Sequence, residues 1–529
     1  MKSRIIILSI LLIGLAVSSY AIPADKRLLT KKQSNGKSIS FTLNGDEFIA
    51  WANSIDGYTL IGNTNGELVY AMLNEKGDLV ASSYLATNPQ ERTQEDKLFL
   101  NTIKPNLFYS NSQLSVFKQN RQERAESLSI ERAPTTGTPN FLVILVSFSD
   151  IAFNQNNATT MQNQISQTNY TANGATGSVK DYFFDNSMGL LNANFTVVGP
   201  YTLPHSRAYY GTPTIFDHDT LPQQMAYDAV NLANNAVNFA NFDNDNDGYV
   251  DMIHIVYAGL GQHNGGGANA IWAHAWVFGQ DVTLDNTNLF RYSCSPELKT
   301  AELVDGIGTM CHEMGHVLGL PDFYDTDYAN SGGYSVNLDD WDLMSSGGYN
   351  NGGMTPPSLT GLEREILNWI TPTELNSNTS CTLPAISDSN KVYRINLTTN
   401  EFFMLEHRNK KKWDAYTSGK GMLVMHGDMN KISAYYGINT DPNDRGFFIV
   451  PAYGDSANIT STSTTFPGSM NVSSFINSKL KNGTPTGKAL SNIQYGTDSV
   501  ITFNYINNSV ALMVNPATNI TNNSATLNG

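Results

Sequence analysis

The stretch GTMCHEMGHVLGLPDFYD, residues Gly308 to Asp325, contains two histidines four positions apart, followed by a glycine and two aspartates. On an α-helix, positions four apart lie on one face, so His312 and His316 can direct two imidazole nitrogens at one point. Neutral histidine nitrogens bind zinc at roughly 2.0–2.1 Å. The stretch therefore predicts a helix that carries a metal site.

A base and a third ligand are predicted from the same stretch. Glu313 would flank the metal and reach a water molecule held by it, as in the H-E-x-x-H zinc peptidases. Gly319 can adopt a positive φ and end the helix, so that the chain turns back toward the metal. Asp322 then stands where the longer metzincin pattern has its third histidine, and a carboxylate is an accepted zinc ligand. Asp325 and Asp327 remain alternatives for the third ligand.

Two other interpretations of the stretch stay open. The histidines of an ordinary core helix would be satisfied by hydrogen bonds, although two histidines beside a glutamate are costly to bury without a metal. In another class of zinc enzyme, a downstream glutamate would complete the site, and GLEREILNW offers Glu363 and Glu365 on a predicted helix.

Several stretches together resemble the immune inhibitor A family of secreted bacterial metallopeptidases, whose motif uses aspartate as third ligand. They span residues 45–505 and include LVILVSFSDIAF, DNDNDGYVDMIHIVYAG, IWAHAW, WDLMSSG and PPSLTGLEREILNWITP. The resemblance implies a metzincin-like catalytic domain made as a proenzyme. It also implies a general base, Glu313, a methionine in a tight turn beneath the metal, Met344, and three zinc ligands: His312, His316 and Asp322.

Two further residues are candidates for lining the site. His274 lies in IWAHAW, where a histidine hydrogen-bonded within a sheet is the alternative. Tyr349 follows the Met344 turn, but the intervening residues do not match the usual spacing of a metzincin tyrosine, so its role stays unassigned.

A second metal site is predicted in DNDNDGYVD. Alternate aspartates, a glycine at the sixth position and a carbonyl at the seventh follow the pattern of a calcium loop. The twelfth position holds His254 instead of glutamate, so the loop is not an EF-hand, and a solvated acidic turn is the alternative. The predicted calcium ligands are Asp243, Asp245, Asp247, Tyr249 and Asp251.

Composition narrows the class of protein. The chain has 529 residues, 40% of them apolar and 15% charged, which predicts several globular domains. A formal net charge of −15 argues against a nucleic-acid partner, because phosphate binding requires a basic face. With only three cysteines, the chain cannot depend on a disulfide framework; one bridge or buried free thiols are both open for Cys294, Cys311 and Cys381.

The first residues predict export. A basic start, an apolar run from Ile5 to Val17, and Ser19 and Ala21 before a cleavage site are typical of a secretory signal peptide. No later apolar run is long enough to span a membrane. We therefore expect a secreted, extracellular bacterial protein.

The rest of the chain divides into four predicted parts. Residues 22–135 form a β-hairpin propeptide that ends in an exposed, cleavable connector with Arg121, Arg124 and Arg132. Residues 136–375 form an α+β catalytic domain, a twisted mixed sheet plus the active-site helix. Residues 376–510 form a β-rich subdomain. Residues 511–529 resemble the first strands of a fibronectin type III-like module in a longer chain, with a frayed tail as the alternative.

Together these features predict a secreted zinc-dependent endopeptidase that acts on proteins or peptides through a Glu313-activated water. The alternative is a non-catalytic zinc- and calcium-binding adhesion protein of the cell surface, which the β-rich C-terminal part would also suit. The sequence indicates no oligomeric state.

Overall fold

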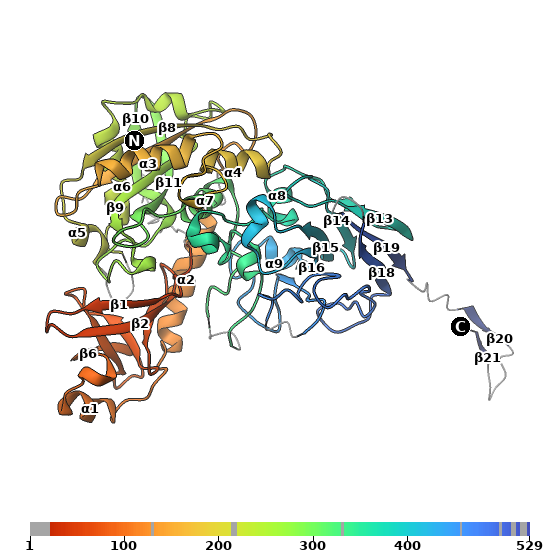
Figure 1. Ribbon diagram of the computed structural model, residues 1–529, viewed down its shortest axis with the longest axis horizontal. Coiled ribbons are helices and arrows are strands. Elements are labelled where there is room, and N and C mark those ends of the chain that lie inside the picture. Colours follow the sequence, from red (N-terminus) through yellow and green to blue (C-terminus); the bar gives the residue numbers. More distant parts are fainter. Residues whose placement is uncertain are drawn as a thin grey trace, which may run out of the picture.

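The computed structural model describes residues 22–128, 132–212, 219–328, 333–454, 458–496, 500–508, 515–518 and 526–528 (Figure 1). Helices and several separate sheets alternate along the chain, which confirms the predicted α+β class. The predicted signal peptide, residues 1–21, lies outside the described residues. None of the described helices has the length and apolar character needed to cross a membrane.

The N-terminal unit is an antiparallel meander of six strands in sequence order, drawn in red and orange in Figure 1. Three dipeptides, Asp56-Gly57, Asn65-Gly66 and Lys76-Gly77, form turns between consecutive strands, with each glycine at positive φ. The strands are β1 (Leu28–Lys32), β2 (Ser38–Gly45), β3 (Ala50–Ser54), β4 (Thr59–Gly62), β5 (Leu68–Leu73) and β6 (Leu79–Leu85), and helices α1 (Gln94–Leu100) and α2 (Asn111–Leu128) follow.

The predicted exposed connector is largely helix α2, and its prediction is wrong at Arg121. That side chain is 4% exposed and forms an ion pair with Asp46, which lies between β2 and β3 and is fully buried. A guanidinium can be buried when it forms an ion pair with a carboxylate. The partner of Arg121 lies far away in the sequence, so a local pattern does not predict the pair. Arg132 is exposed as predicted, whereas the side chain of Arg124 lies outside the described residues.

The central sheet carries the catalytic region. Its order is β10-β11-β9-β7-β8; β7, β8, β9 and β11 run parallel and β10 is antiparallel to β11. The apolar runs FLVILVSF and MIHIVYAGL form β7 and β9 at the buried centre. The strands are β7 (Asn140–Ser147), β8 (Asn194–Thr202), β9 (Ile253–Leu260), β10 (His274–Leu284) and β11 (Thr287–Leu298).

Helices surround this sheet. Ser178 caps helix α4 through a reciprocal capping box with Asp181. Helix α7 contacts β10 and β11 and is buried along its whole length. The longer helices of this region are α3 (Gln155–Ser166), α4 (Val179–Asn186), α6 (Pro222–Ala233) and α7 (Ile307–Leu318).

The C-terminal region joins two sheets, β12-β14-β15-β16-β17 and β13-β19-β18. Alternate residues of β15 divide between two cores: Phe402 and Met404 pack into the catalytic core, and Phe403 and Leu405 pack against the smaller sheet. The strands are β12 (Thr373–Glu374), β13 (Thr379–Leu383), β14 (Tyr393–Asn396), β15 (Glu401–Arg408), β16 (Gly421–Asp428), β17 (Phe447–Ile449), β18 (Lys488–Tyr495) and β19 (Ile501–Asn507).

Two further expectations from the sequence concern the last segment and the cysteines. The described part of the last segment is an antiparallel pair, β20 (Asn515–Thr518) and β21 (Thr526–Asn528), and the fibronectin-like module stays a prediction. The three cysteines are free and buried, so the alternative of buried thiols holds.

Candidate active site

Helix α7 ends where the sequence predicts. Gly319 adopts φ 110°, and its N–H donates to the carbonyls of Gly315 and His316, both at 3.0 Å. A side chain at this φ would be strained, so the glycine permits the reversal that follows. The reversal returns Asp322 to the face of the helix that carries both histidines.

Donor atoms of three residues converge on one point. We call His312, His316 and Asp322 the tripod. His312 Nε2 and His316 Nε2 lie 3.2 Å apart, and Asp322 Oδ1 lies 3.4 and 3.5 Å from them. Ligands of a tetrahedral zinc at roughly 2.0–2.1 Å are separated by roughly 3.3–3.4 Å. Among the described residues these three form one of two groups able to hold a metal ion.

The other ring nitrogens are held by backbone carbonyls. His312 Nδ1 donates to Leu343 O and His316 Nδ1 donates to Leu320 O, both at 2.8 Å. Each hydrogen bond fixes the tautomer in which Nε2 carries a lone pair, which is the arrangement that a zinc-binding histidine needs.

The charge and burial of these three residues also favour the binding of a cation. Asp322 is 4% exposed, and no hydrogen bond to its carboxylate is found within the described chain. Burial acts against its ionisation, but His316 and His312 outweigh this and hold the pKa of Asp322 at about 2. Burial lowers the pKa of His316, so its imidazole is neutral. A buried, ionised carboxylate beside two histidines fits the donor set that zinc requires.

Three of the other acids considered as third ligands have partners of their own. Asp325 accepts three backbone N–H groups, from Asp327, Tyr328 and Ser335, and thereby closes its own loop. Burial raises its pKa to about 8. Two acids of helix α8 (Gly361–Ile366) also have other partners: Glu363 caps that helix through Thr360, and Glu365 pairs with Arg394 at 2.6 Å.

Met344 lies beneath the helix, fully buried. Its Sδ is 3.0 Å from where a side chain at Gly315 would begin, so the two residues pack closely between the histidines. The Met344 carbonyl accepts from Phe323 N at 2.9 Å, next to Asp322. This turn therefore supports both the helix and the third ligand.

The two further candidates differ in position. His274 is buried in β10, with Nδ1 bonded to Trp272 O at 2.8 Å and Nε2 bonded to the Tyr292 hydroxyl at 2.9 Å; it is not part of the tripod. Tyr349 lies in the 3-10 helix η6 (Gly347–Gly353), and burial, together with nearby carboxylates that include Glu313, raises the pKa of its hydroxyl. Tyr349 therefore lies beside the base.

The start of the described N-terminal unit lies against this site, a contact that the sequence analysis did not predict. Glu313 Oε1 accepts from Ile22 N at 2.9 Å, Trp272 Nε1 donates to Ile22 O at 2.8 Å, and the Tyr349 hydroxyl donates to Pro23 O at 2.5 Å. Ile22 is fully buried. No local pattern predicts a contact between residues so far apart in the chain.

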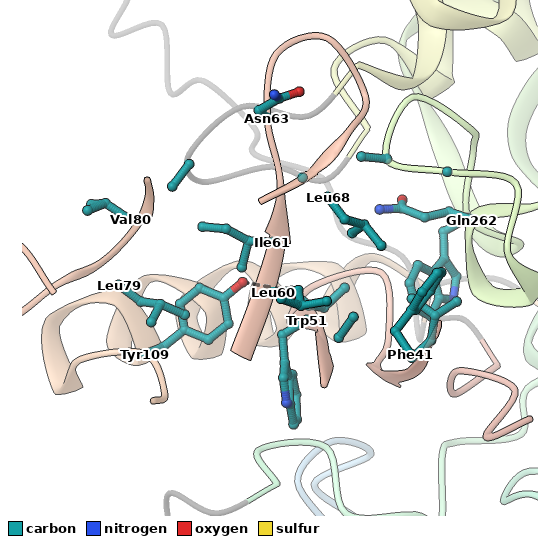
Figure 2. Close-up of a pocket in the computed structure, with 18 of the residues that line it drawn as sticks. Phe41, Trp51, Leu60, Ile61, Asn63, Leu68, Leu79, Val80, Tyr109 and Gln262 are labelled. Atoms are coloured by element: carbon teal, nitrogen blue, oxygen red, sulfur yellow. Dashed lines mark hydrogen bonds between the residues drawn. The ribbon is translucent and has the colours of Figure 1, made fainter. Parts of the chain in front are cut away.

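A separate cavity of about 390 Å³ lies where the N-terminal sheet meets the loop before β10 (Figure 2). Its lining includes side chains of the meander, such as Phe41, Trp51 and Leu60, together with Gln262 and Trp272. None of the tripod residues lines it. The interface between the two units is therefore incompletely packed next to Trp272.

The acidic loop gathers Asp243, Asp245 and Asp247, the second group able to hold a metal ion. Asp251 is outside that group, because its carboxylate accepts from Asn244 N and Nδ2, both at 2.7 Å. His254, at the twelfth position, is buried in β9 between Ser293 and Ser295, which hydrogen-bond its two ring nitrogens.

A buried helix that presents two histidines, a glutamate and a returning aspartate above a methionine turn defines the class of the metallopeptidases. Residues 131–370 match the immune inhibitor A peptidase M6 catalytic domain. The match confirms the resemblance over these residues and supports the predicted enzyme class, a metallopeptidase.

Two similar proteins have names that refer to the same family or to a metalloprotease. Immune inhibitor A of Bacillus thuringiensis subsp. alesti is 31% identical over 222 residues, which cover 35% of this chain and 31% of the relative. Pre-pro-metalloprotease PrtV of Vibrio cholerae serotype O1 is 27% identical over 292 residues, which cover 46% and 31%. The matched segment thus spans about a third of each relative.

A solved structure, metalloproteinase-II from Bacteroides fragilis, aligns with 66% of this chain and 92% of its own. The identity is 12% and the TM-score 0.22, a value too low to define a shared fold.

Proposed function

We propose that the chain is a secreted zinc-dependent endopeptidase that hydrolyses peptide bonds in proteins. The observation that carries the proposal is the tripod of His312, His316 and Asp322, with donor atoms 3.2–3.5 Å apart and Glu313 beside it. The proposed division is a propeptide over 22–135, a catalytic domain over 136–375 and a β-rich subdomain over 376–510.

The chain's own residues supply the proton transfers. Zinc held by the tripod would supply a Lewis acid for the scissile carbonyl and lower the pKa of the attacking water. Glu313 accepts the proton of that water as it attacks the carbonyl carbon. When the C–N bond breaks, Glu313 delivers the proton to the departing amine nitrogen.

The test is Glu313→Gln. The amide keeps the shape of the side chain but cannot accept a proton, so we expect one zinc per chain and no hydrolysis of casein. Zinc is measured by atomic absorption after activation of wild type and variant under the same conditions. Hydrolysis by the variant at the wild-type rate would exclude Glu313 as the base.

We also propose that the chain is made as a proenzyme, as the name of the PrtV relative describes for that protein. Residues Ile22 to Asp25 are buried in the cleft, and Ile22 N bonds to the proposed base. Cleavage at the predicted signal site would make Ile22 N an α-ammonium group. Such a group beside Glu313 would hold its carboxylate in an ion pair and keep substrate out.

Removal of this segment tests latency. A chain secreted with its signal peptide joined directly to Leu28 retains all six strands of the meander but lacks residues 22–27. We expect faster cleavage of small peptides than the intact chain shows. Equal activity of the two chains would contradict this form of latency.

The calcium site is proposed at Asp243, Asp245 and Asp247, with the Tyr249 carbonyl completing the loop and Asp251 ordering it through Asn244. Export is proposed from the predicted signal peptide. Protein or peptide substrates follow from the proposed activity.

A further inference from the structure

The cavity of about 390 Å³ beside Trp272 lies among close contacts between the meander and the segment before β10 (Figure 2). A side chain at Gly62 would begin 2.4 Å from Ala268 Cβ, and a side chain at Gly265 would begin 3.0 Å from Leu29 Cδ1. The two units therefore approach each other closely next to the cavity. Loose docking does not explain so large a space, since protein interiors leave few voids larger than a water molecule.

The lining of the cavity is mostly apolar. It includes Phe41, Trp51, Leu60 and Leu68 of the meander. Pockets of roughly 300–1,000 Å³ that combine apolar side chains with a few polar groups are typical of small-molecule sites. An apolar cavity of roughly 150 Å³ holds one benzene molecule, so the volume here suits an unbranched chain of roughly twelve carbons.

One charged side chain belongs to the lining. Of the described residues that line the cavity, Lys31 alone carries a charge. Its ammonium group donates to Gly66 O at 2.6 Å, and no ion pair to it is found among the described residues. Burial lowers the pKa of Lys31 and outweighs the opposing effect of Glu67. A carboxylate in contact with Lys31 would stabilise its charged form.

A buried amide supplies a second polar group. Gln262 is 9% exposed, and its Oε1 accepts no hydrogen bond within the described chain. Two other polar groups of the lining are engaged: the Tyr109 hydroxyl donates to Ala50 O at 2.7 Å, and the Gln113 amide bonds to both N and O of Leu79. A buried polar atom without a partner is expected to meet a ligand or an ordered water.

Lys31 and Gln262 reach the cavity in neighbouring places. Lys31 Nζ lies 3.2 Å from where a side chain at Gly267 would begin. Gln262 belongs to the same tight turn as Gly267, because Gly265 N donates to Gln262 O at 3.1 Å. The amide of a glutamine can rotate to present its N–H groups. A carboxylate, with two oxygens, can therefore accept from both side chains.

We propose that the cavity binds a free fatty acid of medium length, with its carboxylate on Lys31 and Gln262 and its acyl chain among the apolar side chains of the lining. The negative charge of the ligand follows from Lys31. The length of the chain follows from the volume of the cavity, which is too small for a lipid with two acyl chains.

Such a ligand would join the two units. It contacts the meander through Lys31 and the catalytic region through Gln262 and Trp272. A ligand that binds only the joined state stabilises that state. Where the meander is a propeptide, a bound fatty acid delays its release. This consequence rests on the proposed proenzyme, whereas the binding site itself does not.

Calorimetry on the full secreted chain tests the site. Octanoate, dodecanoate and hexadecanoate are titrated below the concentrations at which they form micelles. Each buried CH₂ contributes about fourfold in affinity, so we expect a steep rise from octanoate to dodecanoate. The rise should end near dodecanoate, where the cavity is full. An absence of binding would mean a gap filled by water, and a rise that continues to hexadecanoate would mean adsorption on the surface; either result would overturn the site.

Matched variants test the head group. Lys31→Gln should weaken dodecanoate binding by about tenfold to a hundredfold, because it removes a charged hydrogen-bond donor. Lys32→Gln is the control, since Lys32 is the next residue of β1, is exposed and does not line the cavity. Dodecanol keeps the chain but has no charge, and it should bind both variants equally. Equal affinity of the two variants for dodecanoate would contradict the proposal.

Ala52→Leu tests the acyl chain. Ala52 is buried and lines the cavity from β3, so a larger side chain takes up space that the ligand needs. We expect dodecanoate binding to fall at least tenfold in a variant that keeps the wild-type circular dichroism spectrum. Unchanged affinity in that variant would place the ligand elsewhere. The result for Lys31→Gln decides the question where Ala52→Leu does not fold.

Limited proteolysis tests the link between the units. The rate at which trypsin separates the meander from the catalytic region is followed on gels. We expect dodecanoate to slow this cleavage at least threefold in wild type and in Lys32→Gln, and to leave it unchanged in Lys31→Gln. Equal rates with and without dodecanoate in wild type would overturn the stabilising role. No readout depends on hydrolysis by this chain, so a failure here is distinct from a failure of the proposed peptidase function.

Discussion

The tripod and the acidic loop both bring three potential ligands together within a short stretch, yet they differ in what satisfies their carboxylates. In the tripod Asp322 is 4% exposed, and no hydrogen bond to its carboxylate is found in the described chain. In the loop, Asp243 and Asp247 accept backbone N–H groups of the loop itself and are partly open to water. The buried carboxylate of Asp322 therefore has more to gain from a cation than the carboxylates of the loop.

A buried pair of carboxyl groups shows another way in which this chain accommodates crowded acids. Asp342 and Glu363 are fully buried next to each other, and burial together with the neighbouring carboxylate raises the pKa of Asp342 well above its usual range. Burial also raises the pKa of Glu363. The pair relieves its repulsion by retaining a proton. Crowded carboxylates in this chain are thus relieved by a proposed metal ion, by backbone N–H groups with water, or by a proton.

The largest effect is expected at Asp322. Asp322→Ala removes the carboxylate that completes the tripod, so zinc content should fall from one per chain toward zero. Activity should fall by about three orders of magnitude or more, because Lewis-acid stabilisation contributes several kcal/mol. Asp327→Asn is the matched control, since Asp327 is nearby but outside the tripod. Unchanged zinc in Asp322→Ala would remove the contrast between the two sites.

Met344 tests how rigidly the buried site is supported. Met344→Ala should destabilise the protein by about 2–5 kcal/mol, because it opens a cavity beneath helix α7. Met344→Leu keeps the volume and should cost less than about 1.5 kcal/mol. Urea denaturation measures both, and zinc affinity should fall with the alanine variant. Equal stability of the two variants would show that the turn supports the site through its backbone alone.

The proton-sharing pair gives a pH dependence. A raised pKa in the folded state means that folding retains a proton which the unfolded chain loses above about pH 4. Stability should therefore fall as pH rises from about 4 through the folded pKa, by up to about 1.4 kcal/mol per pH unit for one proton. Asp342→Asn stays neutral and should remove that slope.

Urea denaturation from pH 4 to 9 measures the slope for Asp342→Asn, wild type and a control. Asp388→Asn alters a carboxylate in an exposed pair with Lys412 and should keep the wild-type slope. If Asp342→Asn kept that slope as well, the pair would not be the group that holds the proton.

The sequence predicted the parts of the site that depend on local geometry. Two histidines one helical turn apart, a glycine that ends the helix and an aspartate after the reversal are all fixed by neighbouring residues. The continuous apolar runs that form the buried strands β7 and β9 are local patterns of the same kind.

Contacts between distant segments could not be predicted. Helix α2 is polar along most of its sequence, and this pattern predicts an exposed connector. The ion pair between Arg121 and Asp46 is visible only in the folded structure. The bond from Ile22 N to Glu313 joins the first described residue to the middle of helix α7. Such pairs require the register of two separate units, which no local pattern contains.

The smallest effect is expected at the acidic loop. At a calcium concentration about five times the dissociation constant, stability should rise by about 1 kcal/mol, and Asp245→Asn should reduce this gain. Zinc content should stay the same, since the loop and the tripod are separate groups. Thermal unfolding with calcium, with magnesium and with a calcium-selective chelator measures the gain. A melting temperature independent of calcium would mean that backbone N–H groups and water alone satisfy the loop, and the contrast with the buried tripod would be sharper still.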